Sequence, residues 1–311
     1  MRVMSLGAGG IGGYFAGRLA EAGTADVTFL VRPARKTQLD RDGLRLESPL
    51  GGFDLKVNSV LSEDVREPAD IVLLTCKAYD LDSAIASIRP AVGPNTGIVP
   101  LLNGLSHLDV LNAEFGKERV LGGLAAIAIT MLPDGLIKHL NDWGAITFGE
   151  QDGQMSSRVS ALETAFSGAK GITCQATTDI MQKMWEKLVF LSTLAGMTTL
   201  MRANMGEIAR APGGVQIALD LLARTASIAA AEGYPMPEPY MERNRALLDD
   251  QTSMLSASML RDMERHGPVE ADHIIGYLLG KARAHGIDDT LHKICYANLK
   301  AYEQRREAGR L

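Results

Sequence analysis

Apolar residues in the first half of the chain fall into short, nearly continuous runs that are separated by segments with helical spacing. Unbroken apolar strands that alternate with helices are typical of a parallel sheet covered by helices on both faces. The expected strands lie in "RVMSL" at the start of the chain and in the runs at 25–33, 69–77 and 96–104.

Two further segments indicate antiparallel pairing. Residues 44–60 have the pattern of a hairpin that is inserted between the strand–helix units. The turn sequence Pro-Asp-Gly at 133–135 lies between apolar runs, which predicts antiparallel strands that finish the sheet.

From about Thr178 the pattern changes to long stretches of helical periodicity with short breaks. The predicted fold class is therefore α/β, with an N-terminal Rossmann-like doubly wound sheet over 1–177 and a second, all-helical domain over 178–311. The expected helices lie at 179–200, 213–232, 238–250, 256–265, 271–285 and 289–305.

Composition narrows the class of function. The chain has 311 residues, of which 46% are hydrophobic and 22% charged, as in an ordinary globular protein of two domains. A formal net charge of -5 without blocks of like charge argues against nucleic-acid and membrane partners. Cys76, Cys174 and Cys295 form no pairing pattern and the start has no signal-peptide pattern, so we expect a cytoplasmic protein. The six histidines show no metal-ligand spacing, so no metal is expected.

Gly7, Gly9 and Gly12 match G-x-G-x-x-G directly after the first expected strand and at the start of a helix. The first glycine permits a tight turn, the second lets a pyrophosphate approach the backbone, and the third allows close packing of helix on strand. The helix N-terminus adds free N–H groups and the positive end of its dipole. This context predicts a dinucleotide site; the alternative is a glycine-rich turn that binds nothing.

The end of the second strand predicts which dinucleotide binds. NAD sites place an Asp or Glu about 20 residues beyond the loop, whereas an Arg accommodates the 2′-phosphate of NADP. Here no acid is present, and Arg32 is followed by Arg35 and Lys36. Because a guanidinium binds phosphate through two hydrogen bonds, the pattern favours NADP, with NADPH as the reductant. The alternative is solvated surface charge, which fits Arg35 and Lys36 better than Arg32.

Polar residues close the third and fourth strands, at Lys77 and Asn103. Ligands of doubly wound sheets lie beyond the carboxyl ends of the strands. Both side chains are therefore candidate contacts to cofactor or substrate, although many strands end in a polar residue.

One lysine lies within the apolar stretch "MWEKLVFLSTLAG" at 184–196. Lys187 shares a helical stripe with Phe190, Leu191 and Leu194. A desolvated ammonium has a lowered pKa and is a competent proton donor near neutral pH. The alternative is a lysine that extends its stem over apolar surface, and helical spacing alone favours that structural role.

Several segments together resemble the ketopantoate reductase (2-dehydropantoate 2-reductase) family over most of the chain. They are "LGAGGIGGYFAGRLAEAG", "LLTCKAYD", "LLNGL", "MWEKLVF" and "SASMLRDMERHGPVEADHIIGYLLGKARAHGI". The resemblance implies an oxidoreductase acting on CH–OH groups, which reduces a small 2-oxo acid to a 2-hydroxy acid with NADPH, as in pantothenate biosynthesis. The small residues at 227–233 are suited to close helix packing, which is compatible with a homodimer.

By position, Lys187 is similar to the general acid of the family, which protonates the ketone oxygen. Glu270 is similar to the glutamate that helps organise the lysine, the substrate and the nicotinamide, and Ser258 to the substrate-binding serine. Lys77 and Asn103 match the family's pair beside the nicotinamide ribose and the substrate. Simpler roles stay open, since Ser258 fits an exposed helix face and Glu270 a helix N-terminus.

The chain departs from the family at two positions. The family usually carries asparagines four and eight residues after the lysine, and here these are Leu191 and Ala195. A pocket that loses such partners loses discrimination for the polar group they served, while an apolar wall accepts alkyl groups. We therefore hypothesise a substrate that lacks the 4-hydroxyl of ketopantoate.

Two other functions remain alternatives. One is a 3-hydroxyacid dehydrogenase of similar architecture, against which the stretch from Ser258 to Glu270 argues. The other is a sensor or regulatory protein that binds NADP without turnover, which the loss of the two asparagines keeps open.

Overall fold

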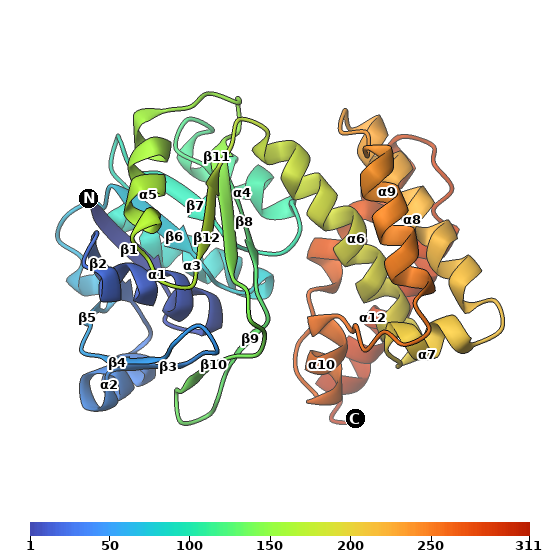
Figure 1. The fold of residues 1–311 in the computed structure, drawn as a ribbon, viewed down its shortest axis with the longest axis horizontal. Coiled ribbons are helices and arrows are strands. Elements are labelled where there is room, and N and C mark those ends of the chain that lie inside the picture. The colour runs from blue at the N-terminus through green and yellow to red at the C-terminus, as the bar shows by residue number, and fades with distance from the viewer. The chain divides into compact units, whose positions relative to one another are not determined.

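The computed structural model describes residues 1–311, which divide into two compact units. The first unit comprises Met1–Leu102 and His107–Ile180, and the second comprises Asn103–Ser106 and Met181–Leu311 (Figure 1). The loop at 103–106, which the sequence pattern assigns to the first domain, therefore groups with the helices of the second unit.

A five-stranded parallel sheet forms the centre of the first unit. Its order is β5-β2-β1-β6-β7, in which the strand order reverses between β1 and β6, as in a Rossmann sheet. The predicted parallel sheet is confirmed, and every residue of β6 and β7 is buried, as their apolar composition requires. The strands are β1 (Arg2–Leu6), β2 (Asp26–Leu30), β5 (Asn58–Val60), β6 (Ile71–Leu74) and β7 (Gly97–Pro100).

Helices connect successive strands of this sheet. They are α1 (Gly10–Ala22), α2 (Pro33–Asp42), α3 (Leu81–Ile88) and α4 (Ser106–Phe115). A short 3₁₀ turn, η2 (Ala78–Asp80), joins the end of β6 to α3. These connections place the ends of β1, β2 and β6 beside one another at the carboxyl edge of the sheet.

A second sheet of four strands packs on α1. Its order is β4-β3-β10-β9, built from β3 (Leu44–Glu47), β4 (Phe53–Leu55), β9 (Ile129–Met131) and β10 (Ile137–His139). The hairpin expected in 44–60 is present as β3 and β4, but its last residues form β5 of the parallel sheet. The prediction that the strands around 133–135 finish the parallel sheet was wrong, because they pair with each other and with β3.

Two glycines of α1 explain where this second sheet lies. A Cβ atom on Gly13 would lie 2.1 Å from Cδ1 of Ile137, and one on Gly17 would lie 2.7 Å from the Phe53 ring. The bare helix surface at these positions lets β4 and β10 approach α1 closely.

A three-stranded sheet extends the unit beyond β7. It has the order β12-β11-β8 and consists of β8 (Leu121–Ala126), β11 (Ala145–Glu150) and β12 (Thr173–Ala176), with α5 (Ser157–Ser167) packed on it. A parallel bridge between Ile98 and Val120 joins it to the central sheet.

The second unit is helical, as predicted. Its helices are α6 (Ile180–Met201), α7 (Met205–Arg210), α8 (Gly214–Ala231), α9 (Glu238–Asp249), α10 (Ser258–Glu264), the π-helical turn η4 (Asp272–Gly276), α11 (Tyr277–Ala284) and α12 (Thr290–Glu307). Only α7 has no counterpart among the predicted helices. By length and apolar composition alone, α8 is long enough to cross a membrane. This is weak evidence for a membrane span, because core helices meet the same criterion.

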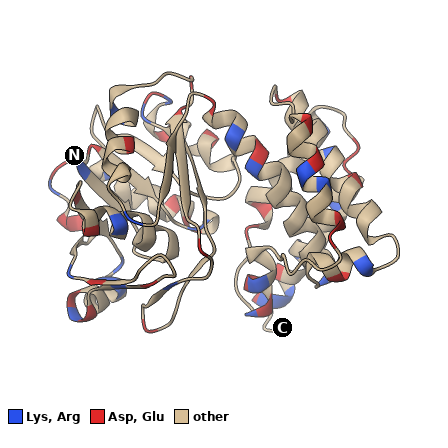
Figure 2. Ribbon diagram, viewed as in Figure 1, with Lys and Arg blue, Asp and Glu red and all other residues tan.

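Charges of both signs are interspersed along the elements of each unit, in keeping with the small net charge (Figure 2). All three cysteines are free thiols, and no group of three or more His, Cys, Asp or Glu side chains is placed to hold a metal ion.

Candidate active site

The glycine loop is a tight turn fixed by hydrogen bonds. Gly7 has a φ of +96°, a conformation that favours glycine, and its N–H donates to the carbonyl of Leu30 over 2.9 Å. The Thr75 hydroxyl donates to the Leu6 carbonyl over 2.7 Å, and the Ser5 hydroxyl donates to the Gly7 carbonyl over 2.9 Å. The loop is therefore held by β1, β2 and the end of β6.

The other two glycines of the motif serve different purposes. A Cβ atom on Gly12 would lie 2.3 Å from the Gly7 carbonyl oxygen, so Gly12 is required for packing within the protein. Gly9 precedes α1 without a side-chain cap, and a Cβ atom there would meet no atom within 4 Å. The space beside Gly9 is thus open, which fits the approach of a pyrophosphate to the N–H groups at the start of α1.

A pocket of about 400 Å³ adjoins this loop, wholly within the first unit. It lies at the carboxyl ends of β1, β2 and β6, where doubly wound sheets bind nucleotides. Its polar and charged lining includes Gly7, Gly9, Arg32, Arg35, Thr75, Lys77 and Asp80. The structure therefore brings Gly7, Gly9, Arg32 and Lys77 together, with Gly12 beneath the loop.

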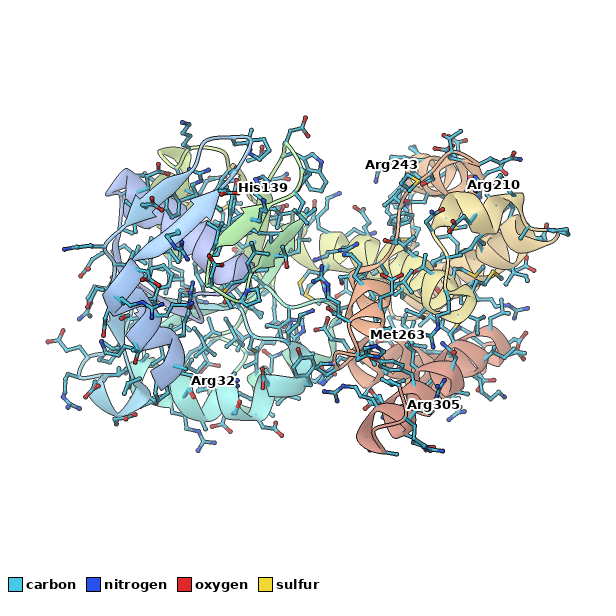
Figure 3. The ribbon with its side chains drawn as sticks, turned by 90° about the horizontal axis from the view of Figure 1, so that it is seen from below. Arg32, His139, Arg210, Arg243, Met263 and Arg305 are labelled. Carbon is cyan, nitrogen blue, oxygen red and sulfur yellow. The ribbon has the colours of Figure 1, made fainter.

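The three cations after β2 have different environments. Arg35 is directed at the loop and donates from Nε and Nη2 to the Ala8 carbonyl, over 3.1 and 2.7 Å. Burial lowers the pKa of Arg35. Lys36 pairs with Asp40 over 3.0 Å and does not line the pocket. Arg32 lines the pocket and is the most exposed of the three, with 73% of its side chain accessible. Figure 3 labels Arg32 among the side chains of the first unit.

Asp80 lines the pocket but was not predicted from the sequence as a site residue. Asp80, at the end of η2, accepts a hydrogen bond from Nη2 of Arg32 on its Oδ1 atom over 3.0 Å. An acid from a segment 48 residues later thus lies beside the arginine that ends β2. The only available signal was an acid shortly after the third strand, in "LLTCKAYD".

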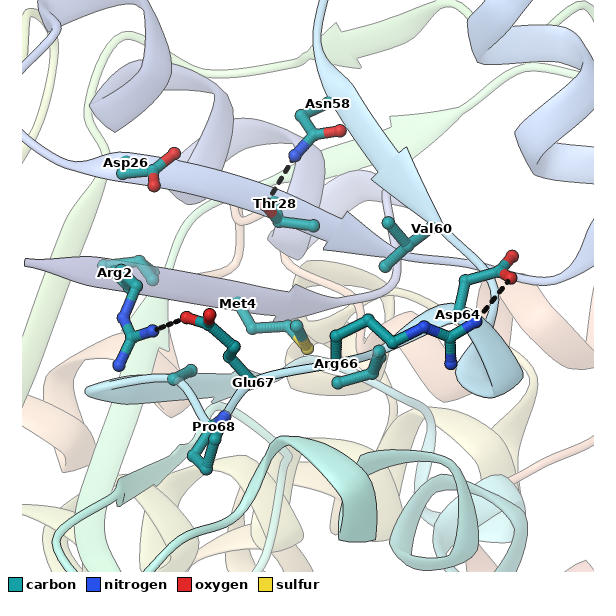
Figure 4. Close-up of a pocket in the computed structure, with 13 residues that line it drawn as sticks. Arg2, Met4, Asp26, Thr28, Asn58, Val60, Asp64, Arg66, Glu67 and Pro68 are labelled. Atoms are coloured by element: carbon teal, nitrogen blue, oxygen red, sulfur yellow. Dashed lines mark hydrogen bonds and ion pairs between the residues drawn. The ribbon is translucent and has the colours of Figure 1, made fainter.

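A second pocket of about 250 Å³ lies near the opposite, amino-terminal ends of the strands (Figure 4). Four of its charged groups form two ion pairs, since Arg2 pairs with Glu67 over 2.5 Å and Arg66 with Asp64 over 3.8 Å. Ligands of this fold bind at the carboxyl edge of the sheet, where the pocket beside the glycine loop lies and this second pocket does not.

Lys187 lies in α6 of the second unit and is half-buried there. Its pKa is lowered to about 8, because burial lowers it and the negative charge of Glu270 offsets only part of that effect. A lysine with such a pKa is mostly protonated at neutral pH and loses its proton at mildly alkaline pH, so it can act as a general acid near neutrality.

Glu270 is 5% exposed and immediately precedes the helical segment that contains η4 and α11. Its backbone carbonyl accepts from the Ile274 N–H over 3.2 Å. Asp272 does not cap this helix, because its carboxylate accepts hydrogen bonds from Tyr296 and Lys300 of α12. A single turn of π-helix inside an α-helix is frequent at functional sites.

The loop at 103–106 packs on this same segment. Gly104 has a φ of +84°, and a Cβ atom there would lie 2.7 Å from the His273 carbonyl oxygen. The Ser106 hydroxyl and Nδ1 of His273 are 3.0 Å apart. Asn103 is therefore held next to the residues that follow Glu270, in the same unit as Lys187.

Ser258 is the first residue of α10, is half-buried, and has no hydrogen bond from its hydroxyl within the protein. Its hydroxyl is thus available to a ligand. Leu191 is also half-buried one turn beyond Lys187, whereas Ala195 is only 1% exposed.

Comparison with known families identifies the chain. The profile of ketopantoate reductase PanE/ApbA matches residues 3–153, and that of the ketopantoate reductase PanE/ApbA C terminal matches residues 179–303. The chain belongs to the ketopantoate reductase family. Both family segments are present, one over most of each unit of the structure.

Individual relatives support this membership. YkpB of Bacillus subtilis, described as an uncharacterized oxidoreductase, is 35% identical over 98% of this chain and 100% of its own length. The 2-dehydropantoate 2-reductase of Nostoc sp. is 27% identical over 98% of this chain and 96% of its own length.

Solved structures show the same fold. The 2-dehydropantoate 2-reductase of Methylococcus capsulatus has a TM-score of 0.86 and 27% identity, with 98% of both chains covered. A D-mandelate dehydrogenase with NADH and anilino(oxo)acetate has a TM-score of 0.87 at 21% identity over 99% of both chains, which is a likeness of fold.

The chain is therefore an NAD(P)-dependent oxidoreductase of the ketopantoate reductase family. The open space before α1 and the charged pocket beside it fit a nicotinamide dinucleotide, which the Gly7–Gly9 backbone, Arg32 and Lys77 would hold.

Proposed function

We propose that the protein reduces a 2-oxo acid to a 2-hydroxy acid with NADPH, and that Lys187 is the general acid. The observation that carries this proposal is the lowered pKa of Lys187, about 8, which results from burial and is partly offset by the charge of Glu270. The pocket beside the glycine loop supports the proposal, because a bound dinucleotide would supply the hydride and Lys187 the proton.

Reduction of the carbonyl needs a group that stabilises the negative charge on the carbonyl oxygen and then gives this oxygen a proton. When bound, the reduced nicotinamide supplies the hydride. Negative charge then develops on the carbonyl oxygen of the substrate, where the ammonium of Lys187 stabilises it and donates a proton. Glu270 keeps the lysine protonated by opposing the effect of its burial. Asn103 and Ser258 are proposed to bind and orient the substrate.

The pH dependence of reduction should follow Lys187. Because the acid must carry its proton, kcat is expected to be level below pH about 8 and to fall about tenfold per pH unit above it. Glu270→Gln removes the charge that raises the lysine pKa, so the falling limb should move to lower pH. Rates measured between pH 6 and 10 check both statements, and an unchanged limb in the variant would contradict the coupling.

Substrate choice is proposed to follow from the two residues beyond Lys187. Leu191 presents an alkyl group where the family usually has an amide, and Ala195 is buried and adds no polar group. An apolar wall offers no partner for the 4-hydroxyl of ketopantoate, so a 2-oxo acid with a plain branched alkyl chain should fit better.

A substrate panel tests this specificity. We expect NADPH oxidation with 2-oxoisovalerate to exceed that with ketopantoate in kcat/KM. Leu191→Asn should shift the ratio of the two substrates about fivefold toward ketopantoate, since it offers a hydrogen bond worth about 1 kcal/mol. Ala195→Asn is unsuitable, because a larger side chain at a buried site would overpack. A wild-type preference for ketopantoate would contradict the specificity but leave the reductase proposal standing.

A further inference from the structure

The charged groups at the ribose end of the dinucleotide pocket form an opposed pair. Arg32 is the N-cap residue of α2 at the end of β2, and Asp80 lies at the end of η2, at the start of α3. Both line the pocket, and the guanidinium donates to Oδ1 of Asp80 over 3.0 Å. The position that distinguishes NAD from NADP therefore carries a cation and an anion together.

The other polar groups nearby are engaged elsewhere. Arg35 is directed at the Ala8 carbonyl, and the hydroxyls of Ser62, Ser83 and Ser87 donate to backbone carbonyls. Asp80 does not use its carboxylate as a helix cap, and its Oδ2 atom has no hydrogen-bond partner in the protein. Lys77 also lines the pocket. Both members of the ion pair between Arg32 and Asp80 lie in the lining, and this pair is placed to respond to the substituent on the ribose.

The geometry points to Asp80 as the residue that limits discrimination between NADPH and NADH, an inference that rests on the proposed dinucleotide site. A 2′-phosphate must compete with Asp80 for Arg32 and is repelled by the carboxylate. A free 2′-hydroxyl can instead donate to Asp80, as to the acid of NAD sites. The pair thus lowers the advantage of NADPH and lets the protein accept both dinucleotides.

Binding of ligand fragments tests this without turnover. The affinities of 2′,5′-ADP and 5′-ADP are measured by calorimetry for the wild type, Asp80→Asn and Asp80→Glu. Asp80→Asn should bind 2′,5′-ADP about tenfold more tightly, a modest factor because both side chains are partly exposed and solvent screens their charges. It should bind 5′-ADP more weakly, and Asp80→Glu should stay close to the wild type.

Asp82→Asn is the matched control, since Asp82 is exposed two residues further along, carries the same charge and does not line the pocket. Arg32→Ala should remove most of the preference for 2′,5′-ADP over 5′-ADP. The proposal is overturned if Asp80→Asn changes this preference no more than Asp82→Asn does.

Kinetics separate the two proposals. The ratio of kcat/KM for NADPH over NADH should rise by more than about tenfold in Asp80→Asn, since the variant gains affinity for the phosphorylated ribose and loses affinity for the free one. If fragments bind as expected but no 2-oxo acid is reduced, the proposed reaction fails while the role of Asp80 stands. If reduction proceeds but Asp80→Asn leaves the fragment affinities unchanged, the role of Asp80 is contradicted and the proposed reaction stands.

Discussion

Replacing Lys187 by methionine is expected to lower kcat for 2-oxo acid reduction about 10²- to 10⁴-fold, the usual range for a lost general acid. Methionine keeps an unbranched side chain of similar length at this half-buried position of α6. The loss of the positive charge near buried Glu270 should lower the stability of the helical unit, which thermal unfolding checks. Because the variant retains the dinucleotide pocket of the first unit, its affinity for NADPH should be unchanged. Steady-state rates and a fluorescence titration with NADPH provide the two measurements.

Lys183→Met is the control for this experiment. Lys183 lies one turn earlier on the same helix, is 42% exposed, and pairs with Glu186 over 2.9 Å. Loss of a surface pair of this kind costs about 0–1 kcal/mol of stability and should leave turnover intact. If Lys187→Met is as active as Lys183→Met, Lys187 is not the acid. If the wild type binds NADPH but reduces no 2-oxo acid, the sensor interpretation gains support instead.

The central sheet was predictable because its strands are marked by local sequence. Each buried strand is an apolar run, and each helix between them has its own periodicity, so neighbouring residues carry the information. The four-stranded sheet was not predictable in the same way. Its strands β3 and β10 lie about 90 residues apart, and their pairing depends on two glycines of α1 that sequence periodicity does not connect to them.

The site shows the same division between local and distant information. The glycine loop is read from contiguous residues, and Lys187 stands out within one helix. The pairing of Arg32 with Asp80 joins two segments that are 48 residues apart in the sequence. Sequence analysis therefore identified the arginine but not the acid. Likewise, the role of Arg35 in holding the Ala8 carbonyl depends on a turn of the chain that no spacing rule reports.

Gly9→Ala is expected to abolish most dinucleotide binding while leaving the fold intact. A methyl group there meets no protein atom within 4 Å, and the backbone, with φ of -84°, is accessible to alanine. The same methyl would occupy the space through which a pyrophosphate reaches the N–H groups of α1. Loss of one such hydrogen bond to a charged group costs about 1.5–3 kcal/mol, which is at least tenfold in affinity.

Gly12→Ala should behave in the opposite way, although it changes the same motif. Its methyl group would lie 2.3 Å from the Gly7 carbonyl oxygen, which is backbone and cannot rotate away, so the fold should lose about 1–3 kcal/mol of stability. Thermal unfolding and NADPH titration on both variants separate the two roles, with Gly280→Ala in α11, also facing open space, as the control. Normal NADPH binding by a folded Gly9→Ala protein would show that the pyrophosphate lies elsewhere, because the structure gives that methyl group nothing else to obstruct.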